Sequence, residues 1–225
     1  MLGVTNSMTP QITIIFDCDG VLVDSEIISH TVLKQMLAEQ GRDLSLQETF
    51  DHFMGTSTEK CQSIFSELTG RPPPPDFTMA FRDRTFDAFR TSLEPVPGIT
   101  ELLSSLKCPF CVASNGPRVK MRFTLGHTGL LRYFDGRLFS AEDVARPKPA
   151  PDLFLHAANE MNAEPRNCVV VEDSPTGVVA AKAAGMFVLG YAAMGQESKL
   201  RAAGADQLLW NMSALHQALP LVHGS

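Results

Sequence analysis

The sequence predicts an α/β protein in which a doubly wound parallel sheet carries helices on both faces and a smaller helical unit is inserted after the first strand. Three observations favour this fold class. Apolar runs that end in a polar residue, such as FCVAS and CVVVE, alternate with helical patterns, as buried parallel strands do. Polar residues cluster directly after these runs, where such sheets bind their ligands. The segment 25–95 breaks the alternation, because it holds helical patterns and no convincing strand.

The expected strands are short apolar runs bounded by turn residues. They lie near 12–17, 110–114, 137–140, 168–172, 187–191 and 207–210. Inside the insertion, helical patterns cover 26–41, 58–69 and 77–92. We therefore expect a core formed by 1–24 and 96–225, and a helical cap formed by 25–95. The cap leaves directly after an acidic cluster and returns through the stiff EPVPG linker, so it is placed to close over a site as a lid.

Composition and charge argue against several functions. The chain has 225 residues, 44% of them hydrophobic and 20% charged, with a formal net charge of −6. This charge gives no attraction to nucleic acid or to an anionic membrane, so an anionic substrate needs a local positive site. The apolar runs are much shorter than the roughly 18 residues of a membrane span, and the opening MLGVTNSMTPQ has neither a basic start nor a hydrophobic segment. We therefore expect a cytoplasmic protein.

The cysteines favour a reducing compartment. There are 5, an odd number in a chain too large to need disulfides. The CPFC pair, Cys108 and Cys111, has the spacing of a redox or metal pair. However, Cys111 falls within an expected strand, and no second pair is present to complete a zinc site. We interpret both as inert thiols.

The first polar cluster follows the strand ITIIF. Asp17 and Asp19 are two positions apart, so in an extended chain both carboxylates face one point beyond the end of the strand. Their repulsion is relieved by a divalent cation, because carboxylate oxygens are the ligands that Mg²⁺ prefers. Gly20 then allows a sharp turn. The alternative is an acidic turn in which Asp24 and Ser25 cap the next helix.

Three further segments carry complementary chemistry. Ser114 and Asn115 end a strand at an apparent helix start, where hydroxyl, amide and backbone N–H groups can bind a phosphate oxygen. Lys148 lies between two prolines that fix the local backbone, and it can place a positive charge near a phosphoryl group. Glu172 and Asp173 follow another buried strand. Each feature also has a structural interpretation as a helix cap or a solvated side chain, but their combination indicates one site.

The order of these motifs resembles the four signature motifs of the haloacid dehalogenase (HAD) superfamily, over essentially the whole chain. The motifs are DCDG, SN, KP and ED, and the helical insertion looks like the small cap of the β-phosphoglucomutase-like subfamily, on a Rossmann-like core. Members with two aspartates in the first motif carry out Mg²⁺-dependent phosphoryl transfer. The resemblance therefore implies a Mg²⁺-dependent phosphomonoester hydrolase, whereas the metal-free dehalogenases of the superfamily lack the second aspartate.

The resemblance also implies a role for each motif residue. Asp17 would attack phosphorus and become an aspartyl phosphate, while Asp19 would act as acid and then as base. Lys148 would neutralise charge in the transition state. The Mg²⁺ ligands would be a carboxylate oxygen of Asp17, the backbone carbonyl of Asp19, Asp173, and Glu172 directly or through water.

Phosphate and substrate contacts are implied in the same way. Ser114, Asn115 and the backbone amides near Cys18 and Asp19 would bind the phosphoryl oxygens. Candidate substrate contacts are Arg118, Thr56 and Ser57. The implied substrates are small sugar and sugar-acid phosphates such as 6-phosphogluconate. We expect the enzyme to act as a monomer on these small metabolites.

Two alternatives remain open. A β-phosphoglucomutase-like mutase carries a histidine twelve positions after the nucleophile and an arginine in the cap loop, where this chain has Ser29 and Thr58. His30 is one step away, and one step turns a helical side chain by about 100°. The second alternative is a non-catalytic binding protein that keeps the fold. The presence of every expected catalytic residue argues against it.

Overall fold

The core is a six-stranded sheet in the order β3-β2-β1-β4-β5-β6, with every neighbouring pair parallel. The computed structural model describes residues 12–54, 56 and 58–219. The strands are β1 (Thr13–Phe16), β2 (Phe110–Ser114), β3 (Leu138–Ser140), β4 (Cys168–Glu172), β5 (Phe187–Tyr191) and β6 (Gln207–Leu209). All six expected strands are present at nearly the expected bounds, and the predicted fold class is confirmed.

Helices cover both faces of this sheet because its strands are apolar on both faces. In β1, Ile14 and Phe16 join one hydrophobic cluster while Ile15 joins the other, as alternating side chains of a strand must. One cluster is covered by α5 (Ile99–Ser105), α6 (Arg118–His127) and α10 (Leu215–Ala218). The other is covered by α7 (Asp152–Glu160), α8 (Pro175–Ala183) and α9 (Glu197–Ala203). Short 3-10 turns complete the core: η1 (Leu131–Tyr133), η2 (Ala141–Asp143), η3 (Pro165–Asn167) and η4 (Met212–Ala214).

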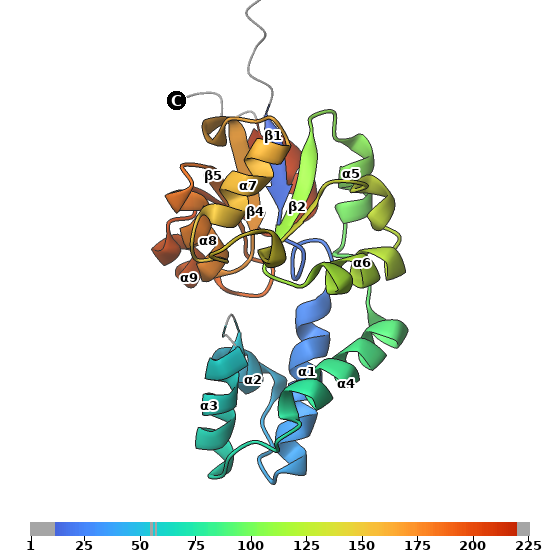
Figure 1. Ribbon diagram of the computed structural model, residues 1–225, viewed down its shortest axis with the longest axis vertical. Helices are drawn as coiled ribbons and strands as arrows, with labels where there is room; N and C mark the ends of the chain where they lie inside the picture. The colour runs from blue at the N-terminus through green and yellow to red at the C-terminus, as the bar shows by residue number, and fades with distance from the viewer. Residues whose placement is uncertain (1–11, 55, 57, 220–225) are drawn as a thin grey trace, which may run out of the picture.

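A group of helices lies beyond one end of the strands, below the sheet in Figure 1. It consists of α1 (Ser25–Glu39), α2 (Leu46–Phe53), α3 (Thr58–Thr69) and α4 (Phe77–Ser92). These helices have their own apolar cluster, which includes Leu33, Leu37, Phe65 and Phe77. We propose on this basis that 25–95 forms a cap domain. Of these helices, α2 was not expected from the sequence; its signal is the capping box of Ser45 and Glu48.

The two connections between the helical group and the sheet pair with each other. Val23 and Pro95 form an antiparallel bridge. The Asp24 N–H donates to the Glu94 carbonyl at 3.0 Å, and the Val96 N–H donates to the Leu22 carbonyl at 3.0 Å. The entry and exit of the proposed cap are therefore one short backbone-paired ribbon.

The structure also bears on the expected inert thiols and on the expected absence of a membrane span. All five cysteines are free thiols, and Cys111 is buried in β2 as the inert-thiol interpretation requires. Burial raises the pKa of the thiols of both Cys108 and Cys111, which disfavours reactive thiolates. No helix in the described part of the chain has the length and apolarity of a membrane span.

Candidate active site

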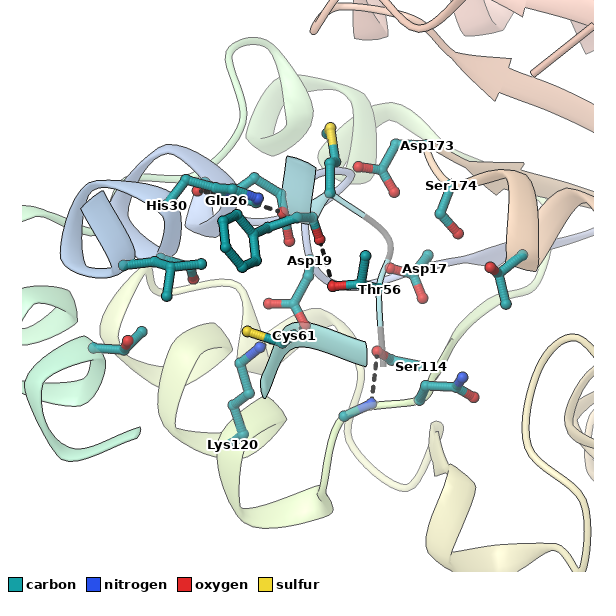
Figure 2. A pocket seen from close by; sticks show the side chains of 18 of the residues that line it. Asp17, Asp19, Glu26, His30, Thr56, Cys61, Ser114, Lys120, Asp173 and Ser174 are labelled. Carbon is teal, nitrogen blue, oxygen red and sulfur yellow. Dashed lines mark hydrogen bonds and ion pairs between the residues drawn. The ribbon is translucent and has the colours of Figure 1, made fainter. Parts of the chain in front are cut away.

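Three adjacent strands bring the predicted motifs together. Because β2, β1 and β4 are parallel neighbours, their carboxyl ends meet at one edge of the sheet. The side chains that follow them line one cavity of about 920 Å³, which extends from this edge to α1–α4. Figure 2 shows Asp17, Ser114 and Asp173 around this cavity, with Glu26 and His30 contributed by α1.

Lys148 joins the first and last acidic motifs. Its ammonium Nζ lies 2.7 Å from Asp17 Oδ1 and 2.8 Å from Glu172 Oε1. Burial alone would lower the pKa of Lys148, but these two carboxylates hold that pKa above its usual range. Burial raises the pKa of Asp17 to about 7, against the opposing charge of Lys148. Lys148 is thus a buried cation held directly against the predicted nucleophile.

Asn115 positions the Lys148 backbone. Its side-chain oxygen accepts from the Lys148 N–H at 3.0 Å, and its amide nitrogen donates to the Lys148 carbonyl at 3.1 Å. The two prolines around Lys148 restrict the same segment. The predicted phosphate contact from Asn115 remains a prediction, since its side chain is already bonded at both ends. Ser114 lines the cavity, and its hydroxyl oxygen accepts only from the Gly116 N–H among the described residues.

Asp19 is held by two groups that the sequence analysis did not assign. Lys120 Nζ lies 2.8 Å from Asp19 Oδ2, and the Ser25 hydroxyl donates to Oδ1 at 2.7 Å. Burial favours the neutral acid, but Lys120 and Ser25 outweigh it and lower the pKa of Asp19. Lys120 comes from α6, directly after the Ser-Asn motif. The sequence feature that could have predicted this role is the position of Lys120 in the first turn of a helix that begins at the edge of the site.

Arg118, the predicted substrate contact, does not reach the cavity. Its guanidinium forms two hydrogen bonds to the Asp143 carboxylate, at 2.7 and 2.6 Å, and is absent from the cavity lining. The physical reason is helical rotation, because residues two positions apart on α6 are separated by about 200°. With Lys120 facing the cavity, Arg118 must face away from it. The prediction that Arg118 contacts the substrate is therefore corrected, and the α6 side chain that lines the cavity is Lys120.

Cys18 contributes no side chain to the cavity. It is buried, and its Sγ lies 4.0 Å from Thr124 Oγ1 in the hydrophobic core. The predicted role of the backbone amides near Cys18 stays a prediction. Of the two cap-loop candidates, Thr56 lines the cavity and donates to the Phe53 carbonyl at 2.7 Å. Ser57 lies outside the described residues.

Three buried carboxylates are placed to hold a metal ion. Asp17, Glu172 and Asp173 each offer an oxygen, and these oxygens lie within 4.8 Å of one another. Burial and then the neighbouring Glu172 raise the pKa of Asp173 well above its usual value. Such mutual repulsion, with hard oxygen donors, fits a divalent cation such as Mg²⁺. The side chain of Asp19 is outside this group, which leaves its backbone carbonyl as the predicted ligand.

The Glu172 carboxylate is closely surrounded by Lys148 and by the first residues of α8. Its Oε2 accepts from the Ser174 N–H at 2.8 Å and from the Ser174 hydroxyl at 3.0 Å, while Oε1 contacts Lys148. A Cβ on Gly177 would lie 1.7 Å from Glu172 Oε1. Only glycine therefore allows α8 to begin so close to the carboxylate.

Helix α1 adds the carboxyl group of Glu26 to the cavity. Burial, followed by the charge of Asp19, raises the pKa of Glu26 to about 7. His30 stacks on Phe50 with ring centroids 4.3 Å apart, and its Nδ1 lies 2.8 Å from the Glu26 carbonyl oxygen. The Ser29 hydroxyl donates to the Ser25 carbonyl at 2.9 Å. Both His30 and Ser29 line the cavity, although the histidine is tied to its own helix.

The motif geometry agrees with comparisons to known proteins. Residues 13–185 match the profile of the haloacid dehalogenase-like hydrolases. The chain belongs to this family. A 6-phosphogluconate phosphatase from Escherichia coli (strain K12) is 38% identical over 181 residues, which cover 80% of this chain and 82% of that protein. The predicted family and hydrolase class are thereby confirmed, and the named phosphatase agrees with the predicted enzyme class.

Solved structures of the family have the same fold. A HAD-like protein of unknown function from Agrobacterium tumefaciens str. C58 is 32% identical with a TM-score of 0.88, covering 94% of this chain and 98% of that one. A HAD family hydrolase from Deinococcus radiodurans R1, solved with bound phosphate and sodium, is 32% identical with a TM-score of 0.84. That match covers 96% of this chain and 97% of the other.

Proposed function

We propose that this HAD-family enzyme is a Mg²⁺-dependent phosphomonoester hydrolase for small sugar or sugar-acid phosphates such as 6-phosphogluconate. The observation that carries the proposal is the buried contact of Lys148 with Asp17 and Glu172, at 2.7 and 2.8 Å. A buried cation beside a carboxylate nucleophile lowers the repulsion that an anionic phosphate would meet. The 38% identity to a 6-phosphogluconate phosphatase supports the substrate class.

In the proposed reaction, Asp17 attacks phosphorus and forms an aspartyl phosphate, which water then hydrolyses. Ser114 and backbone N–H groups near Asp19 bind the phosphoryl oxygens. Asp19 gives a proton to the leaving alcohol and then takes one from the attacking water. Because Lys120 and Ser25 lower the pKa of Asp19, its carboxylate must first take up a proton from solvent as the substrate binds. It then passes this proton to the leaving alcohol, and the proton from the attacking water later replaces it.

Asp17 and Asp173 would hold the Mg²⁺ ion together with the Asp19 carbonyl, with Glu172 contributing directly or through water. When bound, Mg²⁺ would offset the negative charge of the phosphoryl group and of the carboxylates. The proposed cap, 25–95, would exclude water from the cavity. A monomer in the cytoplasm stays our expectation.

The first test is phosphate release from a panel of phosphorylated sugars, sugar acids and nucleotides. Each compound is assayed with Mg²⁺ and again with excess chelator. We expect metal-dependent release that is fastest for 6-phosphogluconate or a related sugar-acid ester. If no compound releases phosphate, the hydrolase proposal is wrong. Interconversion of glucose phosphates would then be assayed, with a binding protein as the remaining alternative.

A further inference from the structure

The two ends of the cavity differ in charge. At the sheet end it is lined by carboxylates from Asp17, Asp19, Glu172 and Asp173, and Glu26 adds another from α1. Lys120 and Lys148 also lie here, and each is already bonded to a carboxylate. These lysines and a bound metal can accept one phosphoryl group. A second anionic group on the substrate would meet repulsion at this end.

The opposite wall is one face of α4. Thr78, Arg82, Thr85 and Phe89 all line the cavity, and their spacing places them on the same side of the helix. Among the described residues, Arg82 is the only arginine or lysine that α1–α4 contribute to the lining. The remainder of this wall is aromatic or hydroxyl-bearing.

Arg82 is free to bind a new partner. It pairs with the adjacent Asp83, with Nη2 at 3.1 Å from Oδ1. Both side chains are largely exposed, at 64% and 62%. Exposed ion pairs of this kind contribute little to stability. Exchanging Asp83 for a substrate anion therefore costs little.

The position of Arg82 suits the far end of a six-carbon substrate. Phe89 on α4 lies beside Lys120, with its ring centroid 6.0 Å from Nζ, and Lys120 contacts Asp19. Arg82 lies about two turns before Phe89, which is roughly 10 Å along the helix. This separation is comparable with the length of an extended six-carbon chain together with its phosphate ester group. Asp17 and Arg82 line the same cavity, so a substrate with its phosphate at Asp17 can extend along α4 toward Arg82.

We propose that Arg82 binds the carboxylate of a sugar-acid phosphate and so selects it over neutral sugar phosphates. This inference rests on the proposed function, because it assigns the end of the substrate opposite to the phosphate. A guanidinium presents two parallel N–H groups to a carboxylate, which adds directional selectivity to the charge. Arg82 is a specificity-determining residue and takes no part in the chemistry at phosphorus.

The test compares 6-phosphogluconate with glucitol 6-phosphate, which differ only in a carboxylate against a hydroxymethyl group. We expect the unmodified enzyme to favour 6-phosphogluconate in kcat/KM. In Arg82→Gln the ratio of the two kcat/KM values should fall by about tenfold or more, mainly through KM for the acid. Arg82→Lys should retain part of the ratio, and Arg82→Glu should lower it further.

Arg84→Gln is the matched control. Arg84 lies on the same helix, pairs with Glu39 and does not line the cavity, so this change should keep the ratio. An equal loss on both esters in Arg82→Gln, or an unmodified enzyme with no preference, would overturn the assignment of Arg82 while the hydrolase function stands. Failure of the unmodified enzyme to hydrolyse either ester would overturn the proposed function and this inference together.

Discussion

The ionisation of Asp17 depends on opposing effects of burial and of a neighbouring charge. Burial raises the pKa of its carboxyl group to about 7 even with Lys148 beside it, yet a nucleophile must be ionised. Lys148 supplies the opposing charge from 2.7 Å, and the Asn115 amide fixes the Lys148 backbone. The reactive carboxylate therefore depends on residues from three separate parts of the chain.

The first prediction concerns the Asp17→Asn variant. It should lower phosphate release by about a thousandfold or more, because an amide cannot form the acyl phosphate. Its melting temperature should stay close to that of the unmodified protein, since Lys148 keeps Glu172 as a partner. Steady-state phosphate release and thermal unfolding measure both effects. Asp135→Asn, at an exposed position away from the cavity, is the control. A normal rate in Asp17→Asn would show that Asp17 is not the nucleophile.

At the scale of elements, the start of α8 determines where Glu172 lies. Ser174 caps the helix by accepting from the Gly177 N–H at 3.1 Å, and Pro175 occupies the first helical position. The same serine donates to Glu172 at 2.8 Å. Because Gly177 has no Cβ, the end of β4 and the start of α8 approach closely enough for Glu172 to reach Lys148.

The second prediction compares two glycines within helices. Gly177→Ala places a Cβ 1.7 Å from Glu172 Oε1, so the carboxylate must move away from Lys148. We expect kcat to fall by about tenfold or more and the melting temperature to fall by several degrees. Gly126→Ala in α6 meets its nearest atom, on Leu131, at 3.9 Å. This control should keep its activity and gain up to about 1 kcal/mol of stability. Unchanged kcat in Gly177→Ala would contradict the proposed role of this contact.

At the scale of the whole molecule, several carboxylates lie together at one edge of the sheet, and the neighbouring lysine neutralises only part of their negative charge. Asp17, Glu172 and Asp173 are buried within reach of one ion, while Lys148 contacts two of them. The raised pKa of Asp173 reflects its burial first and then this repulsion. Metal binding should therefore couple to the stability of the whole core.

The third prediction is that Mg²⁺ raises the melting temperature. At about 100 times its Kd, a ligand that binds only the folded state adds about 2.7 kcal/mol, or roughly 5–10 °C for a chain of this size. Thermal unfolding with Mg²⁺ and with chelator measures the shift. Asp173→Asn should abolish most of the shift, because it removes one of the clustered carboxylates. A shift of equal size in Asp173→Asn would place the ion elsewhere.

The sequence by itself determined the strands, the order of the motifs and the residue types of the site. Largely apolar runs predicted β2 and β4, and the rule that ligands gather at the carboxyl ends of parallel strands predicted a common site for the acids at the ends of β1 and β4. The short helix α2 was missed, although the capping box of Ser45 and Glu48 marks it. These features are local in the chain, so periodicity and turn chemistry reveal them.

Only the tertiary structure decided which side chains face the cavity. The sequence predicts Arg118 as a substrate contact, but the rotation of α6 turns Lys120 toward Asp19 and Arg118 toward Asp143. Likewise, Arg82 gains its proposed role only because α4 lines the same cavity as the carboxyl ends of the strands. The physical reason is that the rotation and packing of a helix depend on contacts between segments far apart in the sequence. A local pattern of residues does not predict these contacts.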